Sequence, residues 1–194
     1  MTPPRRIGLF GGTFDPVHLG HLHLANVAHE ALGLDEVRFI PCTISPHKLN
    51  SHPASAEDRL EMLKLATANL PWAVVDDLEL TSSEPNYSYR TAERMRDRFP
   101  ESQLYWIMGG DQWDALPRWR HPEKLAAIVE FVVLARNDSP QPREGYRMHN
   151  VSGEHPASST RIREAFAKAA EDQHLSKEVA EWIVRQRLYH APPG

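Results

Sequence analysis

The sequence predicts an α/β fold, a doubly wound parallel sheet of five to six strands with helices on both faces and a helical segment at the C-terminus. The first observation is that an apolar run from Ile7, a helical pattern from Leu19 and a second apolar run from Val37 follow one another closely. A strand, a helix and a strand in such succession form a βαβ unit, whose right-handed crossover makes the strands parallel. The second observation is that short apolar runs recur at 103–108 and 131–135. These runs add strands to the same sheet, which is therefore Rossmann-like.

The opening strand ends in two adjacent glycines, Gly11 and Gly12. Glycines at a strand end let the backbone turn tightly and come close to a ligand. Their spacing is not the G-x-G-x-x-G of a dinucleotide fold, and no G-x-x-x-x-G-K-[ST] occurs in the chain. The sequence therefore predicts neither a bound NAD coenzyme nor a P-loop.

Two histidines, His18 and His21, stand at the start of a helix that we expect to run from Leu19 to about Gly33. On one face of the first turn they would lie beside unpaired backbone N–H groups and the positive end of the helix dipole, which is a place for phosphate oxygens. A solvated helix face and half of a metal site are the alternatives for histidines at this spacing. The neighbouring glycine turn favours the phosphate site.

The later part of the chain continues the alternation of strands and helices. Ligands of parallel sheets bind at the carboxyl ends of the strands, where both the Gly11–Gly12 turn and the segment 45–48 are expected to emerge. Strands are expected at 37–41, 72–76, 103–108, 131–135 and 146–151, and helices at 56–68, 87–98, from 121, from 158 and at 176–188, the last of them packed over the sheet.

The composition is that of a soluble globular protein, and 194 residues suffice for one well-buried domain spanning 1–194. The net charge of -4, from 22 basic and 26 acidic residues, argues against a nucleic-acid polymer as partner. No stretch approaches the roughly 18 apolar residues of a membrane span, and no signal-peptide core follows the N-terminal charges. Cys42 is the only cysteine, which excludes an intramolecular disulfide and a cysteine zinc cluster. We therefore expect a cytoplasmic protein with no membrane partner.

Several polar residues near the expected strand ends are candidate ligand contacts. Lys48 could reach a phosphate from the loop after the second strand, although a loop lysine is usually just solvated. Asp111 could accept hydrogen bonds from a ribose, or it could cap the following helix. Trp119 could stack on a ligand ring or belong to the core. The hydroxyls of 158–160 could cap a helix or bind phosphate, and Arg163 one turn later could grip a phosphate with two hydrogen bonds.

Two stretches carry a family resemblance. The run from Gly11 to His21, G-G-T-F-D-P-V-H-L-G-H, resembles the signature of nucleotidyltransferases that join a nucleoside triphosphate to a phosphorylated acceptor and release pyrophosphate. The run from Ser158 to Arg163, S-S-T-R-I-R, resembles the S-S-T-x-I-R signature of the same family. The Pro-His-Lys at 46–48, the Leu-x-x-Trp at 116–119 and the C-terminal helix are similar to those of nicotinate-nucleotide adenylyltransferases. The resemblance covers essentially the whole chain.

The resemblance implies transfer of AMP from ATP to nicotinate mononucleotide, giving nicotinate adenine dinucleotide and pyrophosphate in NAD biosynthesis. The acceptor phosphate would attack the α-phosphorus of ATP in line, without an enzyme-bound intermediate. Mg²⁺ is expected as the companion of the ATP phosphates, and no dedicated metal site of protein side chains is expected. Assembly into a homo-oligomer is left open.

The resemblance also assigns roles to residues. Catalysis falls to His18, His21 and Arg163, with His21 nearest the α-phosphate. ATP binding falls to Gly11, Gly12, Thr13, Phe14, His18, His21, Gly109, Asp111, Ser159, Thr160 and Arg163. Acceptor binding falls to Asp15, Lys48, Tyr87, Ser88 and Trp119.

One turn departs from the family pattern. The Pro-x-Tyr-Thr-x-Asp-Thr of the family keeps Pro85, Tyr87 and Thr91 here, but Ser88 replaces the threonine and Arg90 the aspartate. In the family this turn helps to hold the carboxylate or amide of the pyridine ring. Nicotinamide mononucleotide therefore remains an alternative acceptor. Another phosphorylated acceptor and, from a different class of function, a catalytically silent nucleotide-binding regulator are the further alternatives.

Overall fold

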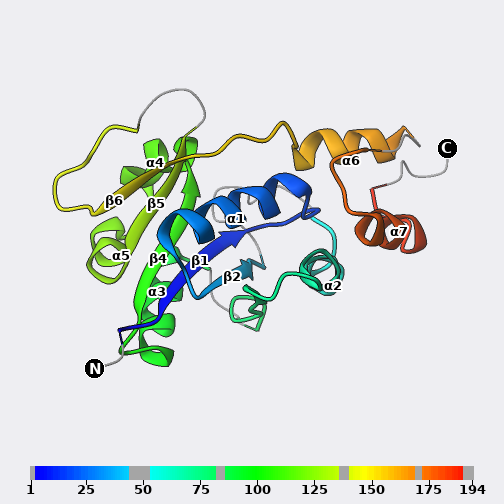
Figure 1. The fold of residues 1–194 in the computed structure, drawn as a ribbon. Helices are drawn as coiled ribbons and strands as arrows, with labels where there is room; N and C mark the ends of the chain where they lie inside the picture. The colour runs from blue at the N-terminus through cyan, green and yellow to red at the C-terminus, as the bar shows by residue number, and fades with distance from the viewer. Residues whose placement is uncertain (1–2, 44–52, 82–85, 136–139, 169–171, 190–194) are drawn as a thin grey trace.

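The computed structural model describes residues 3–43, 53–81, 86–135, 140–168 and 172–189. Within these residues six strands form one sheet in the order β3-β2-β1-β4-β5-β6, and every neighbouring pair is parallel (Figure 1). The predicted doubly wound parallel sheet is thereby confirmed.

The elements lie close to their predicted positions. The strands are β1 (Arg6–Gly12), β2 (Glu36–Pro41), β3 (Ala73–Val75), β4 (Gln103–Gly109), β5 (Glu130–Ala135) and β6 (Met148–Ser152). The helices are α1 (Leu19–Leu32), α2 (Ala56–Thr67), α3 (Ser88–Arg98), α4 (Gly110–Ala115), the short 3₁₀ helix η1 (Leu116–Arg118), α5 (Pro122–Ile128), α6 (Ser159–Ala167) and α7 (Lys177–Arg185).

The strands bury side chains on both faces of the sheet. Successive strand residues point to opposite faces, so Phe10 and Ile107 enter a core shared with α1, α2, α6 and α7. Leu9 and Trp106, their neighbours in sequence, enter the other core with α3, α4 and α5. The continuous apolar runs of the sequence are explained by this burial on two sides, which is typical of parallel sheets.

Local signals set several helix ends. Gly33 caps α1 in the left-handed conformation with φ of 56°, which glycine adopts without the steric cost of a Cβ. Ser55 and Ser176 cap α2 and α7 by accepting hydrogen bonds from Asp58 and Val179 backbone N–H groups. These ends are the ones that the sequence predicts most directly.

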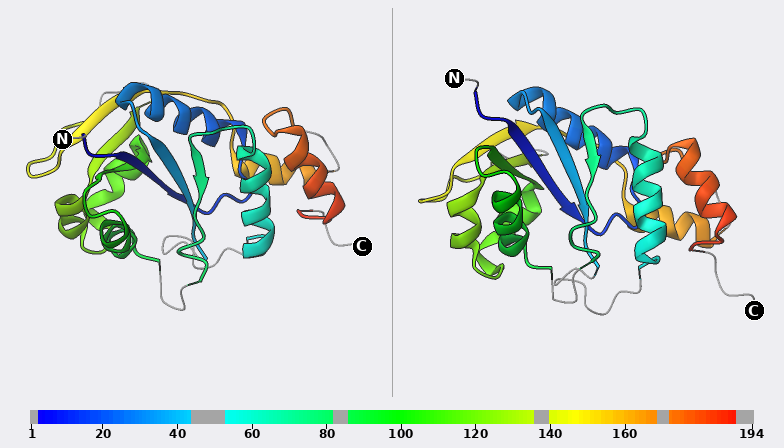
Figure 2. Two further views of the ribbon diagram at one scale, coloured as in Figure 1. Left: turned by 60° about the horizontal axis from the view of Figure 1, so that its bottom comes forward. Right: turned by 90° about the horizontal axis from the view of Figure 1, so that it is seen from below.

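The last helix departs from its predicted place. We expect it over the sheet, but α7 packs beside α2 at the end of the molecule away from β6 (Figures 1 and 2). The Trp182 indole Nε1 donates to Asp58 Oδ1 at 3.2 Å, and Val179 and Ile183 are buried. The apolar face of a helix needs an apolar partner surface, and the sequence does not say which surface that is.

The sheet brings two glycine-rich strand ends together. β1 and β4 are neighbours at the centre of the sheet, where the strand order reverses, and such a switch point is where ligands of doubly wound folds bind. β1 ends at Gly12 and β4 at Gly109, and both glycines border the same cavity. No helix in the described part of the chain is long and apolar enough to cross a membrane.

Candidate active site

A cavity of about 950 Å³ lies at the carboxyl ends of β1 and β4. This volume is near the upper end of the roughly 300–1,000 Å³ typical of small-molecule sites, so nucleotide-sized ligands fit. The predicted residues that line it are Gly11, Gly12, Thr13, Phe14, Asp15, His21, Tyr87, Ser88, Gly109, Asp111, Trp119, Ser159 and Arg163. Among described residues, His18 and Thr160 do not line it, and Lys48 lies outside the described part.

The glycine turn after β1 forms one wall of the cavity. A Cβ on Gly12 would come within 3.1 Å of the Phe14 ring, so glycine allows the chain to fold back tightly here. Phe14 itself has a positive φ of 49°, a backbone conformation that is costly for a bulky side chain. Its ring is buried against Phe10 and His21. The packing holds the turn in this conformation.

His18 and His21 cap α1 together. His18 Nδ1 accepts the backbone N–H of His21, and His21 Nδ1 accepts the backbone N–H of His18, both at 3.2 Å. The two rings are stacked with centroids 3.7 Å apart. This reciprocal arrangement is a capping box built from two histidines. The expectation of unpaired N–H groups in the first turn is therefore wrong for His21, because the His18 ring accepts its N–H.

Gly20 leaves the space that this histidine pair needs. A Cβ at Gly20 would lie 3.0 Å from His18 Nδ1 and 3.1 Å from His155 Nδ1. A side chain there would push the His18 ring out of its stack. The glycine between the two histidines of the motif thus has a packing role.

His18 lies behind His21 rather than on the cavity wall. Its side chain is buried, and burial together with the neighbouring His155 lowers the pKa of His18 to about 4. The ring is therefore neutral at pH 7 and holds His21 by stacking and capping. A direct contact of His18 with ATP stays a prediction.

Replacing His18 by asparagine is expected to make folding less sensitive to acid. The pKa of His18 falls from 6.5 to about 4 on folding, so the unfolded chain binds more protons at mildly acidic pH and stability is lost as the pH falls. Between pH 7 and pH 5 this loss is about 2 kcal/mol. Asparagine can cap a helix but does not titrate. Urea unfolding at both pH values measures the difference, and an equal loss of stability in both proteins would contradict this interpretation.

Asp15 connects the glycine turn to the C-terminal segment. Its Oδ1 accepts the Tyr189 hydroxyl at 2.7 Å and the Ala54 backbone N–H at 3.0 Å. Burial and the Asp15 carboxylate raise the pKa of Tyr189, which keeps the phenol a neutral donor. Asp15 is thus fixed beside the cavity, and its predicted contact with the acceptor stays a prediction.

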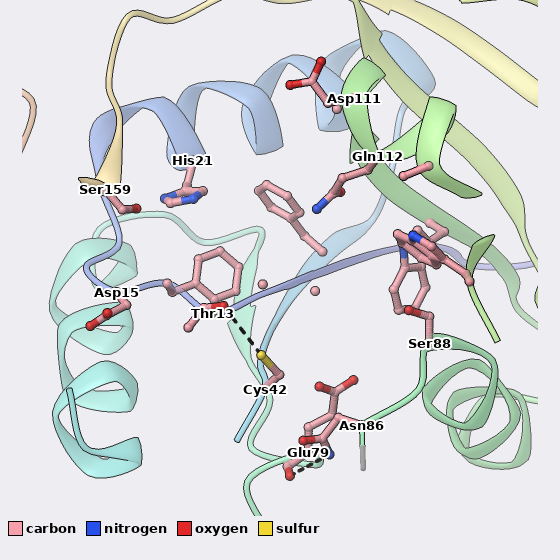
Figure 3. Close-up of a pocket in the computed structure, with 18 of the residues that line it drawn as sticks. Thr13, Asp15, His21, Cys42, Glu79, Asn86, Ser88, Asp111, Gln112 and Ser159 are labelled. Atoms are coloured by element: carbon pink, nitrogen blue, oxygen red, sulfur yellow. Dashed lines mark hydrogen bonds between the residues drawn. The ribbon is translucent and has the colours of Figure 1, made fainter. Parts of the chain in front are cut away.

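The start of α6 is hydrogen-bonded to the turn that follows β1. Ser159 Oγ donates to the Pro16 carbonyl at 3.1 Å, and Figure 3 shows its hydroxyl beside His21. Arg163 Nη1 donates to the Asp15 carbonyl at 2.6 Å. The N-cap residue Ser158 makes no side-chain cap hydrogen bond in the described structure. The two predicted phosphate-binding stretches are thereby brought together, and this part of the cavity is called the phosphate end below.

Arg59 is a residue whose place the sequence does not indicate. An arginine in an amphipathic helix is usually exposed, but only 1% of Arg59 is accessible. Its Nη1 donates to the carbonyls of Thr13 at 2.8 Å and Cys42 at 2.7 Å. The guanidinium ties the ends of β1 and β2 together and places a positive charge beneath the phosphate end.

The opposite part of the cavity, called the acceptor end below, is lined by aromatic and cationic side chains. Ser88 lies far from Ser159 across the cavity (Figure 3). Tyr87, Trp119 and two residues that sequence reasoning missed, Arg118 and Arg120, also line the cavity. The Arg120 guanidinium lies over the Tyr87 ring, 5.3 Å from its centroid.

Arg90, which departs from the family pattern, is not among the described residues that line the cavity. Its Nε donates to the Tyr89 hydroxyl at 3.1 Å. Ser88, the other departure, does line the cavity. Arg90, which stands where the family pattern has an aspartate, is therefore not part of the described lining of the acceptor end.

Asp111 and Cys42 also border the cavity. Gly109 is the N-cap residue of α4, so the interpretation of Asp111 as the cap of that helix is wrong.

Cys42 is buried directly after β2, and burial raises the pKa of its thiol. A raised pKa disfavours the thiolate that a nucleophile needs, so Cys42 is not suited to act as a nucleophile.

Comparison with known proteins shows which protein family the chain belongs to. Residues 9–165 match the model of the cytidylyltransferase-like family. A protein of Bacillus mycoides named probable nicotinate-nucleotide adenylyltransferase is 37% identical over 96% of this chain and 100% of its own length. The protein of the same name in Methylacidiphilum infernorum is 35% identical over 96% of this chain and 93% of its own length.

Solved structures with the same fold are available for comparison. The Plasmodium falciparum nicotinic acid mononucleotide adenylyltransferase complexed with NaAD matches with a TM-score of 0.80, and the complex with APC with 0.78. Each match covers 95% of this chain and 97% of the other at 18% identity, which shows the shared fold. From the sequence relatives, the chain belongs to the cytidylyltransferase-like family and, within it, to the nicotinate-nucleotide adenylyltransferases.

Proposed function

We propose that this protein transfers the adenylyl group of ATP to nicotinate mononucleotide and releases pyrophosphate, forming nicotinate adenine dinucleotide for NAD biosynthesis. The observation that carries the proposal is a single cavity with two unlike ends. One end has histidine, serine and arginine side chains suited to phosphates, and the other has aromatic rings suited to a pyridine ring and arginines suited to its carboxylate. The names of the sequence relatives support the same reaction.

His21 is proposed to stabilise the charge that develops on the α-phosphate. Its Nδ1 accepts the His18 backbone N–H, so a neutral ring carries its proton on Nε2. The capping box fixes the ring, and a donor fixed in advance stabilises a transition state without reorganisation. The attack of the acceptor phosphate on the α-phosphorus is in line, and the chain contributes position and charge.

Arg163 and Ser159 are proposed to bind the β- and γ-phosphates and the leaving pyrophosphate. Arg163 is anchored to the Asp15 carbonyl, and its remaining N–H groups can form charge-assisted hydrogen bonds with phosphate oxygens. The start of α6 adds backbone N–H groups, which favour anions. Thr160 completes the proposed set, and Gly109 and Asp111 contact the ribose. Lys48, which lies outside the described residues, is proposed to bind the acceptor.

Trp119 and Tyr87 are proposed to hold the pyridine ring of the acceptor. Aromatic rings prefer offset stacking, worth about 0.5–1.5 kcal/mol beyond burial. Arg118 and Arg120 line the same end and attract the carboxylate that distinguishes nicotinate from nicotinamide. Nicotinate mononucleotide is therefore the preferred acceptor.

Mg²⁺ is proposed to enter with ATP. In the described part of the chain, no three His, Cys, Asp or Glu side chains are placed to hold a metal ion together. The phosphate oxygens of ATP would then supply most of its ligands, together with water. When bound, the ion neutralises phosphate charge. We further propose that the protein works in the cytoplasm, where ATP is available.

The reaction is tested by coupled pyrophosphate release with ATP and Mg²⁺, comparing nicotinate with nicotinamide mononucleotide at equal concentrations. We expect release with both substrates present and a large preference for nicotinate mononucleotide. A preference for nicotinamide mononucleotide would keep the mechanism and change the substrate. No release with either acceptor would contradict the proposed function and favour a nucleotide-binding regulator.

A further inference from the structure

A buried carboxyl group faces the acceptor end of the cavity. Glu79 lines the cavity although only 5% of the residue is accessible. It lies between β3 and α3, and Figure 3 shows its carboxyl directed toward the space between Cys42 and Ser88. Neither the family motifs nor the proposed mechanism uses this side chain.

The surroundings of Glu79 fix its position. Thr91 Oγ1 donates to Glu79 Oε1 at 2.5 Å. The backbone carbonyl of Glu79 accepts the Thr43 hydroxyl at 2.9 Å and Asn86 Nδ2 at 3.0 Å. Because these hydrogen bonds fix the backbone and one carboxyl oxygen of Glu79, the carboxyl is preorganised for a ligand in the cavity.

Few charged groups lie close enough to the Glu79 carboxyl to offset the cost of burying its ionised form. No ion pair between described residues includes Glu79. The ionisable groups that interact with it electrostatically are Arg94 of α3 and the Cys42 thiol. Arg118 and Arg120 line the same end of the cavity. Burial outweighs Arg94 and the Thr91 hydroxyl and raises the pKa of Glu79 to about 7. The carboxyl can therefore be neutral or ionised near physiological pH.

We propose that Glu79 determines the specificity for the pyridine substituent, its protonated carboxyl donating a hydrogen bond to the carboxylate of the acceptor. The ionised Glu79 carboxyl would instead repel the carboxylate of nicotinate mononucleotide. An acceptor with a carboxamide, such as nicotinamide mononucleotide, would still be able to bind. The inference rests on the proposed function. In its protonated form, the buried Glu79 side chain would allow the carboxylate of the acceptor to bind beside it.

The pH dependence follows from this role. The fraction of protonated Glu79 falls as the pH rises through about 7, so kcat/KM for nicotinate mononucleotide falls as well. Between pH 6 and pH 8 the expected decrease is about tenfold, and it lies mainly in KM. Nicotinamide mononucleotide carries the same phosphate but no carboxylate, so its kcat/KM corrects for titration of the acceptor phosphate.

The test compares Glu79→Gln with the wild-type protein in the pyrophosphate assay from pH 6 to pH 8. Glutamine can still accept the Thr91 hydroxyl and remains a neutral donor at every pH. We expect the ratio of kcat/KM for the two acceptors to fall about tenfold in the wild type and to stay flat in the variant. Glu93→Gln makes the same change at an exposed position of α3 and should keep the wild-type profile. A Glu79→Gln profile equal to that of the wild type would overturn the proposal.

A second measurement does not need a folded variant. Calorimetric titration of the wild-type protein at pH 7.5 in two buffers of different ionisation enthalpy counts the protons taken up with each acceptor. We expect the protein to take up at least about half a proton more when it binds nicotinate mononucleotide than when it binds nicotinamide mononucleotide. Equal proton uptake with the two acceptors would overturn the role of Glu79. If the wild type releases no pyrophosphate with either acceptor at any pH, the proposed function fails. If it is active while Glu79→Gln keeps the wild-type profile, only the role of Glu79 fails.

Discussion

His21→Ala is expected to lower kcat with nicotinate mononucleotide by at least about 10²-fold, the range seen when one donor to a developing charge is lost. The His21 ring lines the cavity and is held by the capping box and by its stack on His18. In the proposed mechanism, removal of the His21 ring takes away the donor nearest the α-phosphate and leaves the other phosphate contacts in place. Steady-state pyrophosphate release at saturating ATP and acceptor measures the effect.

A neighbouring histidine separates the chemical effect from the structural one. His23 is exposed on the same helix and does not line the cavity, so His23→Ala should keep the wild-type turnover. Circular dichroism of both variants checks that α1 is retained, since His21→Ala also removes one half of the capping box. Turnover near the wild-type value in folded His21→Ala would refute the catalytic assignment.

Arg163→Ala is expected to lower kcat/KM for ATP by about 10²- to 10³-fold, through both a higher KM and a lower kcat. The guanidinium lines the cavity and is aimed by its bond to the Asp15 carbonyl. In the proposed mechanism, Arg163 stabilises the triphosphate in the ground state and the pyrophosphate as charge moves onto it. Initial rates over a range of ATP concentrations resolve the two effects.

Two substitutions sharpen this experiment. Arg161 is exposed two residues earlier in α6, and Arg161→Ala should leave the kinetics unchanged. Arg163→Lys keeps the charge but loses the planar fork of donors, so it should recover only part of the loss. Equal kinetics for the alanine variants of Arg161 and Arg163 would rule out the proposed phosphate contact.

Much of the fold follows from local sequence patterns. Apolar runs and the 3.6-residue periodicity predict the strands and helices in order, and Gly33 marks the end of α1 because a left-handed cap favours glycine. The run from Gly11 to His21 and the run from Ser158 to Arg163 both reach the cavity. Their approach could be expected because parallel strands present their carboxyl ends at one edge of the sheet.

The sequence by itself determined the α/β class, the order of the elements and the residues of the phosphate end, since these depend on periodicity, glycine positions and short motifs. Only the tertiary structure decided that His18 lies behind His21, that Arg59 and Glu79 are buried and that α7 packs on α2. The Tyr189 hydroxyl reaches Asp15 across 174 residues of chain. Such contacts depend on which surfaces remain uncovered when the sheet and its helices assemble, and burial by distant segments then shifts the pKa values of Glu79 and His18.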